Sequence, residues 1–383
     1  MFREHLKLMN LVIGEKTLTQ KDDVRRLLLD KKEVELLEIY EKNKKDIADI
    51  LMDIAKNDSE WKFRRDAVKI LGKAEEKASV DLLKEILLKD YLTIMRKTAA
   101  KALGNIGETS AIKPLLEALN TCKDPVVITE VACALGVLKA KEAIEPLTVM
   151  LRKHEDGEIR EHAAEALGNI RDEKAIDALV MSLKEDKEDW VRGRAAEALG
   201  LIGDKRVVPD LISALEKDSG IGVSGKIATA LGRLKDPAAV NPLVKFLQKG
   251  QNEENRRAIT YALGEIGDKE AAEVFLDLLE NDEDETVRYW SCLSLGFIKY
   301  KNAVNIILDV LITDPSVRIR KTAAITLAQF APKTKKAINY ILKSINEDTE
   351  EEVKQQSKEA LIRIAKTHGF KNEKEFLKDL GLS

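Results

Sequence analysis

Aromatic residues, cysteines and long apolar runs are all scarce in this chain of 383 residues. The three cysteines, Cys122, Cys133 and Cys292, form an odd set without metal-ligand spacing, so we expect a reducing compartment and predict no metal or cofactor. No run of 18 apolar residues is present, which excludes a membrane-spanning helix by sequence. Charged and polar residues, beginning with Glu4 and His5, interrupt the N-terminus, which therefore lacks a signal-peptide pattern. We expect a cytoplasmic protein.

An excess of charge of one sign is also missing. Lysine and arginine number 64, aspartate and glutamate number 67, and the formal net charge is −3. The two signs are interspersed along the chain. Such a balance gives no general attraction to nucleic acid or to an anionic membrane, so we predict neither as a partner.

What the chain does contain is a Leu-Gly pair that recurs every 32 residues. A fixed period of this size is typical of a solenoid, in which identical units stack around a shared core. The pairs are Leu71-Gly72, Leu103-Gly104, Leu135-Gly136, Leu167-Gly168, Leu199-Gly200, Leu231-Gly232, Leu263-Gly264 and Leu295-Gly296, and Leu327-Ala328 follows in the same register.

Each unit reads as helix, short turn, helix. Apolar residues before the Leu-Gly pair and after it are spaced by three, four and seven, as on a helix with one buried face. A small residue, usually alanine, stands three positions before the leucine and predicts a close crossing of helices. We interpret the glycine of the pair as a helix end that needs positive φ. The fold class is therefore all-α, a right-handed α-solenoid of about ten 32-residue repeats with atypical helical caps.

The repeats resemble HEAT-like repeats of the phycobilin-lyase type over roughly residues 58 to 365. The resemblance lies in Val191-Arg192, Ala195-Ala196, Ala198-Leu199-Gly200 and Ile202-Gly203-Asp204, and in the equivalent residues of the other copies. It implies that the first helix of each unit lies on the convex outside and the second on the concave inside. It also implies that the recurring arginines and the turn aspartates Asp172, Asp204, Asp236 and Asp268 brace adjacent units.

The pattern divides the chain into three parts. Residues 1–57 lack the Leu-Gly unit and are predicted to form an N-terminal helical cap or degenerate repeat. Residues 58–347 form the HEAT-like solenoid, and residues 348–383 supply the last repeat and a C-terminal cap. Atypical ends are expected because terminal repeats must seal the core.

Two motifs that could suggest catalysis are incomplete. Gly220, Gly222, Gly225 and Lys226 approach a phosphate-binding loop, but Ile227 replaces the Ser or Thr that would bind magnesium. Glu161-His162 resembles the His-Glu pairs of the HEAT-like deoxyhypusine hydroxylases in reversed order, and the four histidines of the chain provide no second pair. We therefore predict no catalytic residues and interpret His162 as a solvated surface side chain.

The polar stripe of the second helices, which we place on the concave face, is acidic on balance. Its most acidic section contains Glu273, Asp277, Glu280 and Asp309. A duplex-binding groove needs clustered Lys and Arg, so this stripe argues against nucleic acid. It favours a basic segment of another protein.

An aromatic cluster lies beside this section in the sequence. Tyr289, Trp290, Phe297 and Tyr300 fall within 12 residues, in a chain that is 4% aromatic, and Tyr261 replaces a polar residue one repeat earlier. Exposed Trp and Tyr are typical anchors of protein interfaces. The alternative is that these rings fill an irregular gap between repeats, and the sequence favours neither.

Three functions are compatible with these features. We predict a non-enzymatic scaffold or adaptor for protein–protein interaction and complex assembly, with its partner site around residues 261 to 312. Resemblance to the lyases implies a bilin-lyase-like cofactor attachment or chaperone factor as the alternative. A DNA-base glycosylase-like binder ranks third, because Trp190 and Trp290 are expected on the outside and the inner stripe is acidic. The sequence leaves self-association open.

Overall fold

The computed structural model describes residues 21–217, 220 and 222–382. Every regular element among these residues is helical, as the repeat pattern predicts. Residues 1–20 of the predicted N-terminal cap lie outside the described residues. The chain divides into two compact units, residues 1–182 and residues 183–383, and each is described by itself.

The first unit begins with three helices that precede the regular repeats, and then alternates first and second helices. Its α-helices are α2 (Lys21–Leu29), α3 (Glu33–Lys42), α4 (Lys44–Asn57), α5 (Trp61–Lys73), α6 (Val80–Lys89), α7 (Thr93–Ile106), α8 (Ile112–Thr121), α9 (Pro125–Val137), α10 (Ile144–Lys153), α11 (Gly157–Ile170) and α12 (Ile176–Glu185), whose last residues belong to the second unit.

The second unit continues the alternation and closes with one short helix. Its α-helices are α13 (Asp189–Ile202), α14 (Val208–Lys217), α15 (Val223–Leu234), α16 (Val240–Leu247), α17 (Glu253–Ile266), α18 (Ala272–Asn281), α19 (Glu285–Phe297), α20 (Val304–Thr313), α21 (Val317–Phe330), α22 (Lys335–Glu347), α23 (Glu351–Thr367) and α24 (Glu373–Asp379).

A single 3-10 turn leads into each second helix from α6 to α20. These turns are η1 (Lys77–Ser79), η2 (Thr109–Ala111), η3 (Lys141–Ala143), η4 (Glu173–Ala175), η5 (Lys205–Val207), η6 (Pro237–Ala239), η7 (Lys269–Ala271) and η8 (Lys301–Ala303).

The glycines of the Leu-Gly pairs do not end the helices, so that prediction is wrong. Gly72 and Gly232 lie inside α5 and α15, where a Cβ would approach to 2.7 Å from the Cα of Ala102 and of Ala262, respectively. The glycine therefore lets consecutive first helices touch backbone to backbone. Positive φ occurs three residues later, for example at Gly203 or Lys235, where the helix ends.

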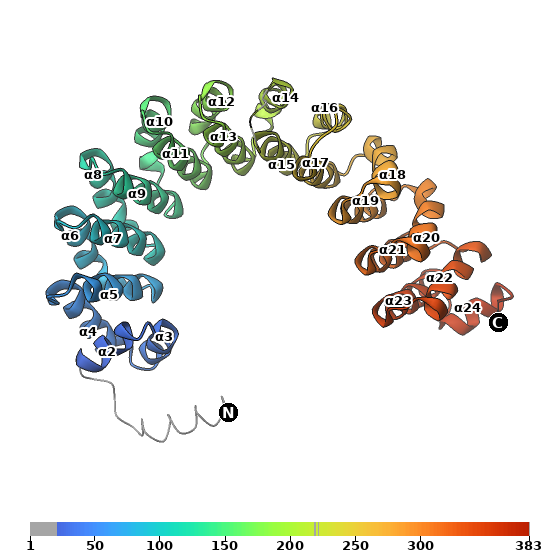
Figure 1. The fold of residues 1–383 in the computed structure, drawn as a ribbon, viewed down its shortest axis with the longest axis horizontal. Helices are drawn as coiled ribbons and strands as arrows, with labels where there is room; N and C mark the ends of the chain where they lie inside the picture. The colour runs from blue at the N-terminus through green and yellow to red at the C-terminus, as the bar shows by residue number, and fades with distance from the viewer. Residues whose placement is uncertain (1–20, 218–219, 221, 383) are drawn as a thin grey trace, which may run out of the picture. The chain divides into compact units, whose positions relative to one another are not determined.

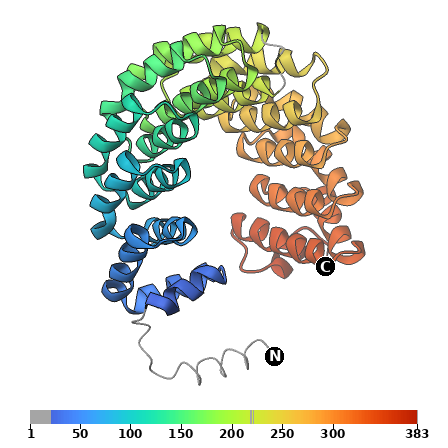
Figure 2. The same ribbon diagram turned by 60° about the vertical axis from the view of Figure 1, so that its left-hand side comes forward.

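The predicted inner and outer sides of the repeat are wrong: the first helices lie on the inner side and the second helices on the outer side (Figure 1). Within each unit, consecutive first helices pack tightly, whereas consecutive second helices make far fewer contacts with each other. Within the first unit α7, α9 and α11 lie on the inner side of the curve and α6, α8 and α10 on the outer side, and the second unit has the same order of layers (Figure 1). Figure 2 shows the two layers from another side. The small residues shorten the spacing on the side of the first helices, so each unit curves toward that side.

The recurring arginines brace adjacent repeats, as the resemblance implies, but their acidic partners differ from those expected. Arg288 donates two hydrogen bonds to the carboxylate of Asp314, at 2.8 and 3.1 Å, and Arg320 does the same to Asp348, at 2.7 and 3.0 Å. Arg256 pairs with Asp282 in the same way. These aspartates follow the second helices.

The turn aspartates act mainly within their own turns. Asp204 accepts a hydrogen bond from the backbone N–H of Arg206, and Asp172, Asp236 and Asp268 cap their 3-10 turns in the same way. Asp172 in addition pairs with Lys141 of the preceding repeat, at 3.4 Å.

Candidate functional site

Four of the five aromatic residues singled out in the sequence lie on first helices, and therefore on the inner side of the second unit. Tyr261 is on α17, and Tyr289, Trp290 and Phe297 are on α19. Trp290 and Phe297 are seven residues apart and so share one face of the helix. We call these four residues, together with Arg318 of α21, the inner aromatic patch.

The patch extends over three consecutive first helices, with rings on α17 and α19 and the Arg318 guanidinium on α21. The Trp290 ring meets Tyr261 edge to face with 4.9 Å between centroids, and meets Tyr289 in the same way at 5.3 Å. The Arg318 guanidinium lies 3.8 Å from the centroid of the Tyr289 ring. Edge-to-face pairs and cation–π contacts are favourable arrangements for aromatic rings. Tyr261, Trp290 and Tyr289 thus hold one another in position.

The same side chains remain accessible. Tyr261, Tyr289 and Trp290 are half-buried, and Phe297 is 64% exposed. The sequence left interface and packing as alternatives. The structure shows inter-repeat packing of Tyr261 and Trp290, together with apolar surface that stays open to solvent.

Tyr300 does not belong to this patch. It precedes η8, and its hydroxyl donates a hydrogen bond to the carboxylate of Glu273 on α18. This hydrogen bond to the carboxylate raises the pKa of Tyr300. Tyr300 therefore lies with the second helices.

The acidic residues Glu273, Asp277, Glu280 and Asp309 are all exposed on second helices. Glu273 and Asp277 line a hollow of about 470 Å³ that also includes Leu247 and Arg256. A second hollow of about 470 Å³ lies between α18 and α20 and includes Glu280 and Asp309. The predicted acidic section therefore exists, but on the outer side of the curve, opposite to the predicted concave face.

The predicted site residues consequently form two separate groups. The inner aromatic patch and the acidic hollows lie on opposite layers of the same repeats. Trp190, which we expected outside, is on α13 and so on the inner side, where it is 48% exposed. Sequence periodicity identified the unusual residues without telling on which side of the curve their helix lies.

The family model for HEAT repeats matches residues 48–136, 124–200, 183–264, 208–296, 240–315 and 272–362. The chain belongs to the HEAT-repeat family. A comparison with curated proteins found no match.

Solved structures with a similar fold include importin beta and a lyase. Importin beta in an ammonium sulfate condition is 14% identical with a TM-score of 0.64, over 87% of this chain and 54% of that one. Yeast importin-beta is 15% identical with a TM-score of 0.57, over 94% and 54%. The chain thus spans about half the length of these importins. The CpcE–CpcF complex of phycocyanin lyase from a Nostoc species is 23% identical with a TM-score of 0.38, over 62% and 94%. The likeness to the importins concerns the fold alone.

Several cations on the inner side of the HEAT repeats are paired with acids. Glu197 contacts both Arg194, at 2.8 Å, and Lys226, at 3.8 Å. Arg257 pairs with Asp284 at 2.6 Å. In the first unit, Lys69 and Lys73 both contact Glu33. The acidic stripe of the second helices lies on the outer side, so these ion pairs are what counts against nucleic acid on the inner side.

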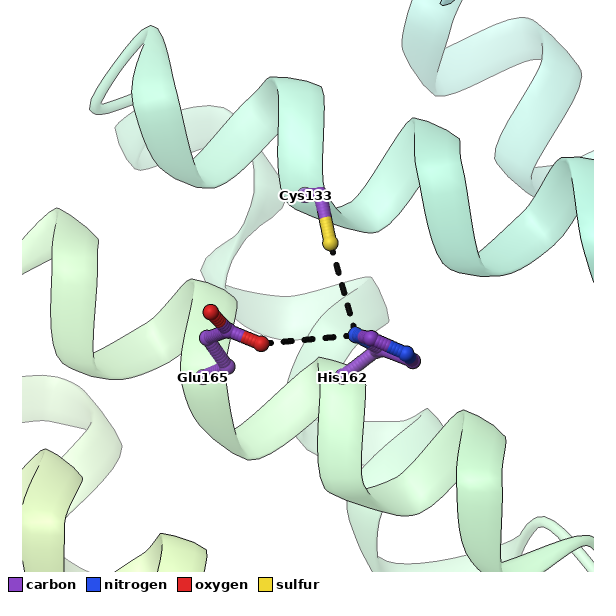
Figure 3. A group of neighbouring side chains, drawn as sticks. All are labelled: Cys133, His162 and Glu165. Atoms are coloured by element: carbon purple, nitrogen blue, oxygen red, sulfur yellow. Dashed lines mark hydrogen bonds and ion pairs between the residues drawn. The ribbon is translucent and has the colours of Figure 1, made fainter. Parts of the chain in front are cut away.

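A third group of residues was not expected from the sequence. Cys133 of α9 and His162 and Glu165 of α11 come together on the inner side of the first unit (Figure 3). His162 Nδ1 lies 3.4 Å from Cys133 Sγ and 3.4 Å from Glu165 Oε2. The interactions with Cys133 and then Glu165 raise the pKa of His162 to about 10. His162 is half-buried and partnered, so its interpretation as a solvated side chain is wrong.

The sequence signal for this group was present at an unusual spacing. Cys133 and Glu165 are 32 residues apart, which is one repeat, and Cys133 and His162 are 29 apart. The pairs Glu197–Lys226 and Tyr261–Trp290 have the same spacing of 29 and are also in contact. Metal-ligand patterns written for short loops miss residues that meet across a repeat.

No helix of the described residues is both long and apolar enough to cross a membrane.

Proposed function

We propose that this HEAT-repeat protein is a non-enzymatic scaffold or adaptor that binds another protein through the inner aromatic patch. The observation that carries the proposal is the row formed by Tyr261, Trp290 and Tyr289, which is held by edge-to-face contacts and is still accessible. Pre-ordered aromatic side chains lose little conformational freedom on binding and dominate the affinity of many interfaces.

The patch favours a partner segment with apolar side chains. Phe297 adds exposed apolar area at the end of α19, and Arg318 supplies a cation at the other edge. A central apolar anchor with polar residues at its rim is the common arrangement of protein interfaces. The partner is therefore expected to insert apolar residues over Trp290 and Phe297.

The acidic hollows support a second, separate contact on the outer side. Glu273, Asp277, Glu280 and Asp309 are exposed there within two neighbouring hollows. A basic segment of a partner would find complementary charge at this surface. Exposed charges of this kind affect association rate more than affinity, so we assign the anchoring role to the aromatic patch.

The test is capture of partners from the source organism followed by mass spectrometry. Wild type is compared with Tyr289→Ala/Trp290→Ala, and Trp190→Ala serves as the matched control because it removes an exposed tryptophan of the same layer outside the patch. The proposal requires a partner that is retained by wild type and by Trp190→Ala and is lost by the double variant. Circular dichroism must show equal helical content for all three proteins.

Two outcomes would contradict this assignment. If the double variant retains every partner, the aromatic patch is a packing feature and the acidic hollows become the better candidate. If no protein is retained and a coloured small molecule co-purifies, a lyase-like function replaces the scaffold. We also propose a cytoplasmic location, with three free cysteines as its support.

A further inference from the structure

Three different metal-ligating side chains converge in the first unit, whereas the inner aromatic patch belongs to the second. The ligand atoms of Cys133, His162 and Glu165 all lie within 4.8 Å of one another, and the two separations from His162 Nδ1 are 3.4 Å each. Tetrahedral zinc, with bonds of about 2.3 Å to sulfur and about 2.0–2.2 Å to nitrogen and oxygen, holds its ligand atoms roughly 3.4–3.6 Å apart. The observed separations from Nδ1 fit that geometry.

The arrangement does not suit a Cys-His-Glu relay. In such a relay one imidazole nitrogen faces the nucleophile and the other faces the acid. Here the thiol and the carboxylate both face Nδ1 of His162 (Figure 3). A cation requires several ligand atoms that point to one position, and the thiol sulfur, the carboxylate oxygen and Nδ1 do so here. We propose that Cys133, His162 and Glu165 bind a single thiophilic divalent cation of the Zn²⁺ class.

The repeat itself holds these donors in place. Cys133 and Glu165 occupy equivalent positions on α9 and α11, and His162 lies three residues before Glu165 on the same helix face. Three residues after Cys133, Gly136 packs so closely on α11 that a Cβ would lie 2.9 Å from the Cα of Ala166. The distance between the two helices is therefore fixed beside the site, as a metal site needs.

The donor set selects the kind of cation. A thiolate and an imidazole favour Zn²⁺ over Mg²⁺ or Ca²⁺, which take oxygen ligands. Three protein ligands leave the fourth tetrahedral position for water or for a side chain of a bound partner. The side chains of His162 and Glu165 are 29% and 35% exposed, so that position is accessible from the inner side.

Titration with Co²⁺ under reducing conditions tests the site directly, because a cobalt–thiolate bond gives a charge-transfer absorption in the near ultraviolet. The full-length chain, freed of metal by a chelator, is titrated as wild type, Cys133→Ser, His162→Gln and Cys122→Ser. Cys122 is a half-buried thiol at the end of α8 and is the matched control. Added Zn²⁺ then competes with the bound Co²⁺.

We expect one equivalent of Co²⁺ in wild type and in Cys122→Ser, with the absorption displaced by Zn²⁺. Cys133→Ser should lose the absorption, and His162→Gln should bind at least about tenfold more weakly, since even partners behind the ligands commonly contribute that much. Absence of binding to folded wild type would overturn the proposal, as would equal binding by Cys133→Ser. This result is independent of any protein partner, so it stands or falls separately from the proposed scaffold function.

Discussion

At the scale of single residues, the fold depends on small side chains in fixed positions of the first helix. Gly104 faces Ala134 and Gly136 faces Ala166 in the same way, one repeat later. The sequence revealed the recurrence of these glycines but suggested a helix end. Glycine is suited both to a helix end with positive φ and to a close contact between helices. Deciding between them requires the helix length to within three residues, which the periodicity of the apolar positions does not provide.

Two glycines of the same helix should respond in opposite ways to alanine. In Gly232→Ala the new Cβ would lie 2.7 Å from the backbone of Ala262, whereas in Gly225→Ala the nearest atom is the side-chain oxygen of Asn255 at 3.3 Å. We expect Gly232→Ala to lower the free energy of unfolding by about 1–3 kcal/mol through overpacking. Gly225→Ala should have little effect or stabilise, because alanine favours a helix by about 1 kcal/mol. Urea unfolding measures both, and equal effects would disprove the close-contact role.

The Arg320–Asp348 pair should make stability depend on pH in the acid range. Burial raises the pKa of the Asp348 carboxyl, but the hydrogen bonds from Arg320 and the backbone of Glu350 outweigh it, and the pKa lies below its ordinary 3.8. A lowered folded pKa gives stability that is present above pH 3.8 and is lost as the pH falls through the folded pKa.

Comparing wild type with Asp348→Asn isolates this effect. The free energies of unfolding should differ by about 1.5–3 kcal/mol near neutral pH, the typical contribution of hydrogen bonds to a charged group. The difference should remain constant down to about pH 5 and shrink below about pH 4, as the unfolded carboxyl of wild type takes up its proton. A difference that does not change with pH would contradict the assignment.

At the scale of elements, the first helices carry both the tight packing and the unusual surface. Residues 29 apart meet on the inner side of consecutive first helices, as Cys133 meets His162 and Tyr261 meets Trp290. Apolar periodicity predicted correctly that each repeat is a pair of helices with one buried face. It could not predict the layer to which each helix belongs, because both helices bury a similar apolar stripe and the curvature arises from the Gly–Ala contacts between repeats.

The edge-to-face contact between Tyr261 of α17 and Trp290 of α19 should be measurable as an interaction free energy between two mutations. In a double-mutant cycle of Tyr261→Ala and Trp290→Ala, we expect an interaction free energy of roughly 0.5–1.5 kcal/mol, the usual value for an edge-to-face pair. Tyr261→Ala with Phe297→Ala is the control pair, because it shares the patch without a ring contact between those residues. Strict additivity in both pairs would show that the rings do not pack in solution.

At the scale of the whole molecule, the repeat class was predictable and the sites were predictable in part. The 32-residue period determines which apolar positions each unit buries, and eight Leu-Gly copies in one register leave few alternatives to a solenoid of helical repeats. The inner aromatic patch was found as a local exception to the repeat. The group formed by Cys133, His162 and Glu165 was missed, because its members meet only when one repeat is stacked on the next.

The ion pairs on the inner side predict weak attraction for nucleic acid. Inner cations such as Arg194 and Lys226 share Glu197, and Arg257 is paired with Asp284. Paired cations release few counterions from a phosphate backbone, and salt-sensitive binding requires such release. We expect no binding of a fluorescently labelled duplex in anisotropy titrations at 50 mM salt. Saturable binding that weakens steeply between roughly 50 and 200 mM salt would favour the DNA-binding alternative.

An affinity titration with the captured partner measures directly whether the inner aromatic patch anchors it. Tyr289→Ala/Trp290→Ala should weaken binding at least about 30-fold, equivalent to about 2 kcal/mol. Glu273→Gln/Asp277→Gln/Glu280→Gln on the outer side should change affinity only severalfold. The reverse ranking, with the outer variant losing binding and the aromatic variant retaining it, would show that the partner is anchored at the acidic hollows instead.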